Sequence, residues 1–184
     1  ALRCWIYPGQ HGPLDVVHGI QNSCNVFFSE MGHRLSMDEN GNYSPELGIE
    51  KIRKYASMFG LDETSGIEIA EREPQMTTEK SEASSIGQGK NSYSNIQLSR
   101  YITAVANKGT VFKLSLLDKM TDSQGNLLKD FTPEVRSTID VKDSTWNAVH
   151  TGMRRVIKDG TARNIFSDLE VDIAGKTGTA EEIK

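Results

Sequence analysis

The sequence has little of several features that define specialised protein classes. Its 184 residues contain two cysteines, five prolines and 7% aromatic residues. No apolar run approaches the roughly 20 residues that span a bilayer, and the first residues lack the apolar stretch of a signal peptide. Acidic residues outnumber lysine and arginine, 25 to 21, so the clustered basic face of a nucleic-acid-binding protein is not expected. We therefore expect neither a membrane span nor a nucleic-acid partner within this chain.

The two cysteines are too few for a disulfide framework. Cys4 and Cys24 could pair in an oxidising compartment, but the sequence leaves their pairing open. Neither has a second cysteine or a histidine at the spacing of a compact zinc knuckle. We therefore expect no metal site, and nothing in the sequence calls for a cofactor.

The composition is that of one globular domain, with 36% hydrophobic and 25% charged residues. Apolar spacing and turn residues predict a mixed α and β fold in which residues 1–13 are irregular and 61–93 are mostly loop. The predicted helices are 14–35 with a break near 21–23, 46–59, 94–109 and 143–160, and the predicted strands are 111–120, 127–131 and 169–174.

Two of these elements carry specific local signals. Ser94 and Gln97 are spaced as a capping box, which places a helix start at Ser94. Its expected buried stripe consists of Leu98, Tyr101, Ile102 and Val105. The polar residues 123–126 between two apolar runs predict the turn of a β-hairpin.

Lys176-Thr177-Gly178-Thr179 is the first candidate site, at the end of the predicted strand 169–174. The lysine would attract a carboxylate, the two threonine hydroxyls could hydrogen-bond it, and the glycine would let a substrate lie against the strand. A plain surface turn is the alternative. A phosphate-binding loop is excluded, because Glu170 stands where that loop needs a glycine.

Ser23-Cys24-Asn25 is the second candidate, at the predicted break between two helical stretches. There the Ser23 hydroxyl could relay a proton, and the Asn25 carboxamide could hold a substrate amide or a neighbouring lysine. The alternative is that Ser23 or Asn25 is only the N-cap of the second helix.

In this order, the two motifs resemble the active-site signature of penicillin-binding proteins and serine β-lactamases. The likeness spans nearly the whole chain and is closest to the monofunctional, class B penicillin-binding proteins. Segments that match in order are His11-Gly12, 18–28, Ile86-Gly87-Gln88-Gly89, 95–98, 104–109, Gly152-Met153, Gly160-Thr161-Ala162 and 174–181.

The resemblance implies the α/β transpeptidase fold, mainly its helical part plus the Lys-Thr-Gly strand, and a D,D-transpeptidase that cross-links cell-wall peptides. It implies proton transfer and substrate holding for Ser23 and Asn25. Lys176, Thr177 and Thr179 would bind the substrate carboxylate beside Gly178, with the Thr179 amide in the oxyanion hole. D-alanyl-D-alanine stem peptides and β-lactams would be the ligands, and other cell-wall synthesis proteins the partners, at the extracytoplasmic face of the membrane.

The family's nucleophile, the serine of a Ser-x-x-Lys motif, is missing. No serine is followed three residues later by lysine, and Thr77 with Lys80 lies after Ser23 rather than before it. We therefore expect 1–184 to be a partial domain, truncated at both ends, inactive alone and completed by the remainder of the same domain.

Two other functions remain open. A β-lactam-sensing domain or a non-catalytic peptidoglycan-binding module would use the same two motifs. A β-lactamase is disfavoured, because no glutamate is identifiable as its deacylation base.

Overall fold

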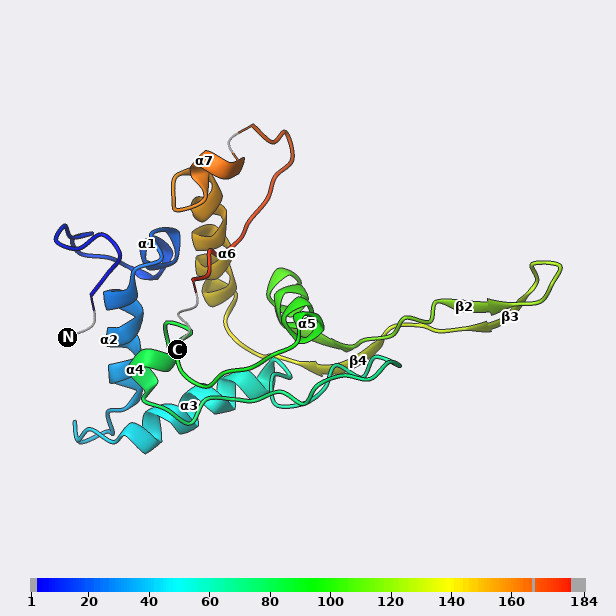
Figure 1. Cartoon of the computed structure of the whole chain (residues 1–184), viewed down its shortest axis with the longest axis horizontal. Coiled ribbons are helices and arrows are strands. Elements are labelled where there is room, and N and C mark those ends of the chain that lie inside the picture. Colours follow the sequence, from blue (N-terminus) through cyan, green and yellow to red (C-terminus); the bar gives the residue numbers. More distant parts are fainter. Residues whose placement is uncertain (1–2, 167, 180–184) are drawn as a thin grey trace. The chain divides into compact units, whose positions relative to one another are not determined.

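A computed structural model describes residues 3–166 and 168–179 (Figure 1). The chain divides into two compact units, each made of separate stretches of sequence. The first unit comprises 1–52, 77–91 and 141–184, and the second comprises 53–76 and 92–140. Across the described ranges, no helix has the length and apolar character needed to cross a membrane.

The first unit is helical. Its helices are α1 (Val16–Gln21), α2 (Asn25–Leu35), α4 (Ser81–Ser84), α6 (Asp143–Lys158) and α7 (Arg163–Phe166), and α3 (Pro45–Met58) begins in it. The predicted break in the first helical region is confirmed, because α1 and α2 are separated by residues 22–24. The helices expected at 46–59 and 143–160 are also confirmed, within one or two residues at each end.

The core of this unit lies between α1 and α6. Ile20, Val156 and Ala162 are buried there, and the surrounding partly buried residues are Phe28, Val149, Met153 and Ile157. Gly152 allows the close approach of the two helices, since a Cβ at this position would lie 2.8 Å from Cβ of Ile20. Because α1 leads directly to Ser23, this packing fixes the start of one candidate motif.

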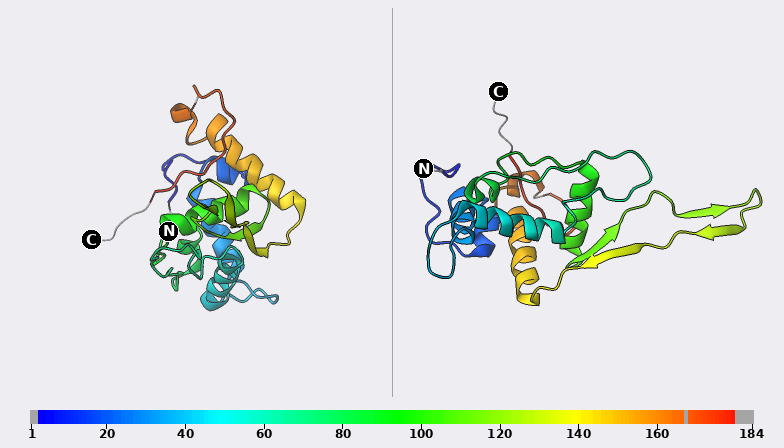
Figure 2. Two further views of the ribbon diagram at one scale, coloured as in Figure 1. Left: turned by 90° about the vertical axis from the view of Figure 1, so that its right-hand side faces the viewer. Right: turned by 90° about the horizontal axis from the view of Figure 1, so that it is seen from below.

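The second unit combines helix α5 (Asn95–Ala106) with four short strands. Strand β1 (Thr110–Lys113) pairs antiparallel with β4 (Glu134–Thr138), and β2 (Lys119–Thr121) pairs antiparallel with β3 (Leu127–Asp130). The two pairs follow one another along a single ribbon that runs away from α5 (Figures 1 and 2). The predicted hairpin is confirmed, since β2 and β3 flank the turn.

Three strand predictions need correction. The run 111–120 is not one strand, because β1 and β2 are separated by residues 114–118. Strand β4 was missed: its side chains are mostly polar and exposed, so it has no apolar alternation, and pairing with β1 makes it a strand. Residues 169–174 are not a strand, because no neighbouring strand in the described part of the chain pairs with them.

Helix α5 begins as predicted, but only part of its expected apolar stripe is buried. Both hydrogen bonds of the Ser94–Gln97 capping box are present. Val105 is buried and Tyr101 partly buried, as predicted, but Leu98 and Ile102 are 41% and 46% exposed. Gln97 and Arg100, which were not expected to be buried, are almost fully buried, because a polar network covers their side of the helix.

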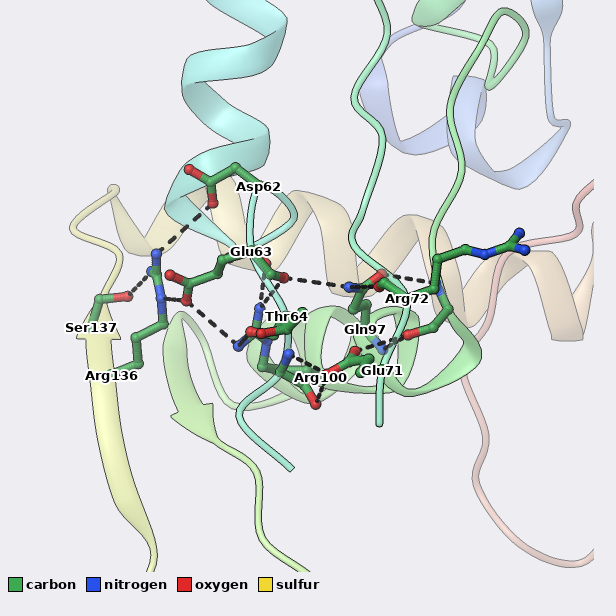
Figure 3. A network of polar contacts seen from close by, with 12 residues as sticks. Asp62, Glu63, Thr64, Glu71, Arg72, Gln97, Arg100, Arg136 and Ser137 are labelled. Carbon is green, nitrogen blue, oxygen red and sulfur yellow. Dashed lines mark hydrogen bonds and ion pairs between the residues drawn. The ribbon is translucent and has the colours of Figure 1, made fainter. Parts of the chain in front are cut away.

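That network joins α5 to the loop at 60–72 (Figure 3). Arg100 donates to the carbonyl oxygens of Gly60 and Thr64, and Gln97 Nε2 donates to that of Arg72 at 3.3 Å. Glu63 pairs with Arg100 and also with Arg136 of β4. A buried guanidinium is tolerated only when paired in this way, and its desolvation lowers the pKa of Arg100.

Candidate functional site

Ser23 lies in the three-residue gap between α1 and α2. Its φ is 48°, a left-handed conformation that residues other than glycine adopt at a cost of about 1 kcal/mol or more. The amide of Ser23 donates to the carbonyl oxygen of Ile20 at 3.1 Å, and the amide of Cys24 donates to that of Gly19 at 3.1 Å. This tight turn ends α1 and leads the chain into α2.

The Ser23 side chain is not a helix cap. The N-cap of α2 is Cys24, without a side-chain capping bond, and Asn25 is the first helical residue. The capping alternative for this motif is therefore wrong. Instead, Nζ of Lys176 donates to Oγ of Ser23 at 2.6 Å, although 153 positions separate the two residues.

Lys176 links the two candidate motifs. Its ammonium also donates to the carbonyl oxygen of Thr177 at 2.8 Å. Burial lowers the pKa of Lys176, although the side chain keeps exposed surface. A cation in this position can attract a carboxylate, and its lowered pKa favours proton exchange with the serine hydroxyl.

The other predicted site residues lie around this pair. Oγ1 of Thr177 is 2.9 Å from Oγ1 of Thr161, and Nε2 of Gln88 is 3.4 Å from the carbonyl oxygen of Thr179. Apart from its two chain neighbours, no heavy atom of the described residues lies within 4 Å of where a Cβ of Gly178 would be, so among these residues the surface is open to a ligand. Within 3–166 and 168–179, the Asn25 carboxamide makes no hydrogen bond.

The segment before Lys176 is held without strand pairing. The amide of Gly175 donates to the carbonyl oxygen of Met153 at 3.1 Å, and Arg154 of α6 donates to that of Ile173 at 3.0 Å. Arg154 also pairs with Asp172. Helix α6 therefore positions the Lys-Thr-Gly segment. The last two residues of the matching stretch, Ala180 and Glu181, lie outside the described residues.

A second set of contacts fixes α1 against α6. Asp15 accepts from the amide of His18 at 2.9 Å and contacts its Nδ1 at 2.7 Å, and these bonds lower the pKa of Asp15. Nη1 of Arg155 is 3.1 Å from Nε2 of His18. Because arginine can only donate, Nε2 accepts and the ring proton lies on Nδ1, facing Asp15. These contacts hold the helix that ends at the Ser23 turn.

Cys4, His11 and Cys24 form a cluster that the sequence analysis missed. Sγ of Cys4 is 3.8 Å from Sγ of Cys24 and 3.6 Å from Nδ1 of His11, and all three atoms lie within 4.8 Å of one another. Both thiols are free. In a tetrahedral zinc site, two sulfur ligands lie about 3.8 Å apart, and a sulfur and a nitrogen ligand lie about 3.6 Å apart. The distances in the cluster agree with these values, so the cluster suits a thiophilic cation.

The two thiols differ in acidity. Burial raises the pKa of Cys4, but hydrogen bonds from the amides of Asn25, Ile6 and Val26 and from Cys24 outweigh it and lower the pKa overall. Burial raises the pKa of Cys24. His11 was missed as a third ligand because it lies seven residues from Cys4 and lacks knuckle spacing; no signal in the sequence brings it to Cys24.

The family model described as "Penicillin binding protein transpeptidase domain" matches residues 2–184. Penicillin-binding protein H of Bacillus subtilis is 29% identical over 92% of this chain and 26% of its own length. Peptidoglycan D,D-transpeptidase MrdA of Escherichia coli K12 is 26% identical over 93% of this chain and 28% of its own length. The chain thus spans about a quarter of the curated relatives it matches.

A solved structure described as showing the "coordination of polymerization and crosslinking by a peptidoglycan synthase complex" is similar in fold. The TM-score is 0.82 with 24% sequence identity, covering 98% of this chain and 30% of the other. The α/β fold class expected from the resemblance is therefore confirmed.

Proposed function

This chain belongs to the penicillin-binding protein transpeptidase domain family, and from that premise we propose that it supplies the Ser-x-Asn and Lys-Thr-Gly parts of a D,D-transpeptidase active site. The observation that carries the proposal is the 2.6 Å contact between Nζ of Lys176 and Oγ of Ser23, which joins the two motifs. The open surface at Gly178 leaves room for a ligand beside them.

Each predicted site residue has a role in this proposal. Lys176 attracts the substrate carboxylate and exchanges a proton with Ser23. Thr177 and Thr179 donate hydroxyl hydrogen bonds to the same carboxylate, and the amide of Thr179 stabilises an oxyanion. Asn25 holds a substrate amide, which fits a carboxamide without an internal hydrogen bond in the described part of the chain.

The substrates are peptidoglycan stem peptides ending in D-alanyl-D-alanine, and β-lactams are their mimics. The site of action is the extracytoplasmic face of the bacterial membrane, with other cell-wall synthesis proteins as partners. The peptidoglycan substrate is supported by the relative MrdA, a peptidoglycan D,D-transpeptidase, and by the structural neighbour, which comes from a study of a peptidoglycan synthase complex.

The chain alone is proposed to be inactive, because no Ser-x-x-Lys nucleophile occurs in its sequence. Intact mass after incubation with a β-lactam tests this directly. We expect an unchanged mass for this chain and a covalent adduct for a longer chain that carries Ser-x-x-Lys before Ser23. An adduct on residues 1–184 alone would refute the proposed inactivity, and peptide mapping would identify the nucleophile.

In the longer chain, Lys176→Ala should slow acylation by at least about a hundredfold, a typical cost of removing a group that stabilises charge in the transition state. Lys129→Ala, in the exposed strand β3, is the matched control and should acylate at the wild-type rate. Equal acylation rates for both variants would show that Lys176 has no role in acylation.

A β-lactam sensor or a non-catalytic peptidoglycan-binding module is the alternative function. An acyl-enzyme that transfers its acyl group to an added amine acceptor supports transpeptidation. Stable acylation without transfer supports a sensor, and peptide binding without acylation supports a binding module.

A further inference from the structure

Thr161 contacts both halves of the candidate site. Its amide donates to the carbonyl oxygen of Gln21 at 3.4 Å, and its hydroxyl oxygen is 2.9 Å from that of Thr177. Gln21 is the last residue of α1, immediately before the turn that carries Ser23. Thr177 follows Lys176, which donates to Ser23. The serine turn and the Lys-Thr-Gly segment are therefore joined twice, directly by Lys176 and Ser23 and indirectly through Thr161.

The backbone around Thr161 is held firmly. Ala162 is 2% exposed, and its amide donates to the carbonyl oxygen of Val156 at 3.0 Å. Gly160 lies so close to Gln21 that a Cβ there would overlap the Gln21 carbonyl oxygen. A glycine is required for this approach, and it brings the following hydroxyl to a fixed position facing Thr177.

The direction of the Thr161–Thr177 hydrogen bond has a chemical consequence. Each hydroxyl has one proton to donate. If Thr177 donates to Thr161, its proton is engaged and cannot reach a ligand. If Thr161 donates to Thr177, the Thr177 proton is free for a carboxylate, and the chain of two bonds strengthens that interaction. A carboxylate ligand selects the second arrangement.

We propose that Thr161 is a positioning residue of this site, whose hydroxyl orients Thr177 as a donor to the substrate carboxylate. The role rests on the proposed function and deepens it, because it assigns carboxylate recognition to a relay of two hydroxyls. Thr161 touches neither the substrate nor the reacting atoms, and it acts only through Thr177.

The test measures the second-order rate of acylation by a fluorescent penicillin in a longer chain that carries the nucleophile. Thr161→Val removes the hydroxyl with little change in volume and should lower the rate about tenfold, as expected for one lost hydrogen bond. Thr161→Ser keeps the hydroxyl and should stay within about threefold of wild type. Thr151→Val, on an exposed turn of α6, is the control and should not change the rate.

A double-mutant cycle separates positioning from general destabilisation. If Thr161 acts through Thr177, then Thr161→Val should have no further effect in a Thr177→Val background. Independent, additive losses in the double variant would overturn the proposal, and so would a wild-type rate for Thr161→Val. Failure of wild type to acylate would refute the proposed function instead.

Hydrogen–deuterium exchange supplies a readout that does not depend on acylation. In Thr161→Val the amides of 175–179 should exchange faster than in Thr161→Ser, while α2 remains protected. Equal exchange in both variants would show that the hydroxyl does not hold this segment. Faster exchange throughout the first unit would mean that Thr161→Val only destabilises the fold.

Discussion

At the residue scale, the Ser23 turn combines a strained backbone with a functional side chain. Ser23 and Lys108 are the positive-φ residues other than glycine in the described ranges. Strain of this kind persists where the surrounding structure imposes it, and α1 is held against α6 on one side of the turn. The serine is therefore kept at a cost that glycine would avoid.

Ser23→Gly and Ser23→Ala should separate these two contributions. Both remove the hydroxyl that accepts from Lys176, but only glycine relieves the left-handed conformation. We expect Ser23→Gly to be about 1 kcal/mol more stable than Ser23→Ala, measured by denaturant unfolding. Equal stability of the two variants would show that the turn is not strained.

The cysteine pair gives a second prediction at this scale. Cys4 has a lowered pKa and is partly exposed, whereas Cys24 has a raised pKa and is buried. Because the thiolate is the reactive form, Cys4 should be alkylated by iodoacetamide well before Cys24 near neutral pH. Mass mapping after short exposure checks the order, and faster labelling of Cys24 would contradict it.

At the element scale, α5 shows where reasoning from sequence succeeds and where it fails. The capping box is a local signal, and it places the helix start correctly. The buried face is a tertiary property, because Gln97 and Arg100 are buried only where loop carbonyl oxygens satisfy them. Strand β4 could not be predicted for the same reason, because it is a strand only through its pairing with β1.

The candidate site divides in the same way. The two motifs could be identified from residue order, and the family resemblance implied that both belong to one active site. Thr161 and Gln88 stood in matching segments without a role, because a hydroxyl or carboxamide partner far along the chain leaves no periodic signal. Only the packing of α6 against α1 brings Thr161 to the site.

Removing Arg100 should weaken the second unit strongly. Arg100→Ala leaves the carbonyl oxygens of Gly60 and Thr64 without their donor and opens a cavity, at an expected cost of about 3 kcal/mol or more. Lys119→Ala in the exposed strand β2 should change stability by less than about 0.5 kcal/mol. Urea unfolding compares them, and a similar midpoint for both would mean that the network contributes little.

Glu71 makes the attachment of this loop to α5 dependent on pH. Burial raises its pKa, but bonds from the amide and hydroxyl of Ser65 and the hydroxyl of Ser94 outweigh this effect and lower the pKa overall. The carboxylate thus stabilises the fold fully above its unfolded pKa of about 4.3, and this contribution is lost as pH falls through the lower folded pKa.

Glu71→Gln should therefore be less stable than wild type at pH 7, and the difference should shrink on acidification below about pH 4. Urea midpoints for the two proteins across this range measure the change. A difference that stays constant with pH would show that the Glu71 charge does not contribute.

At the scale of the whole molecule, the chain passes repeatedly between two compact units. The sequence predicts one partial domain over 1–184, with no linker or change in composition to mark a boundary. The units are built from interleaved stretches, and such an arrangement leaves no signal in composition. The candidate site residues belong to the first unit, and the Arg100 network to the second.

If each unit has its own core, damage to one core should remain local. Val156 in the first unit and Val111 in the second are both fully buried. Val→Ala at either position creates a cavity and should lower the free energy of unfolding by about 1–3 kcal/mol. Hydrogen–deuterium exchange under native conditions reports such opening segment by segment. We expect Val156→Ala to speed exchange in α1 and α6, and Val111→Ala to speed it in α5 and β4, each leaving the other unit protected. Equal acceleration throughout the chain in both variants would instead mean that the two units unfold as one cooperative structure, in which case the Ser23–Lys176 site would depend on the Arg100 network for its stability.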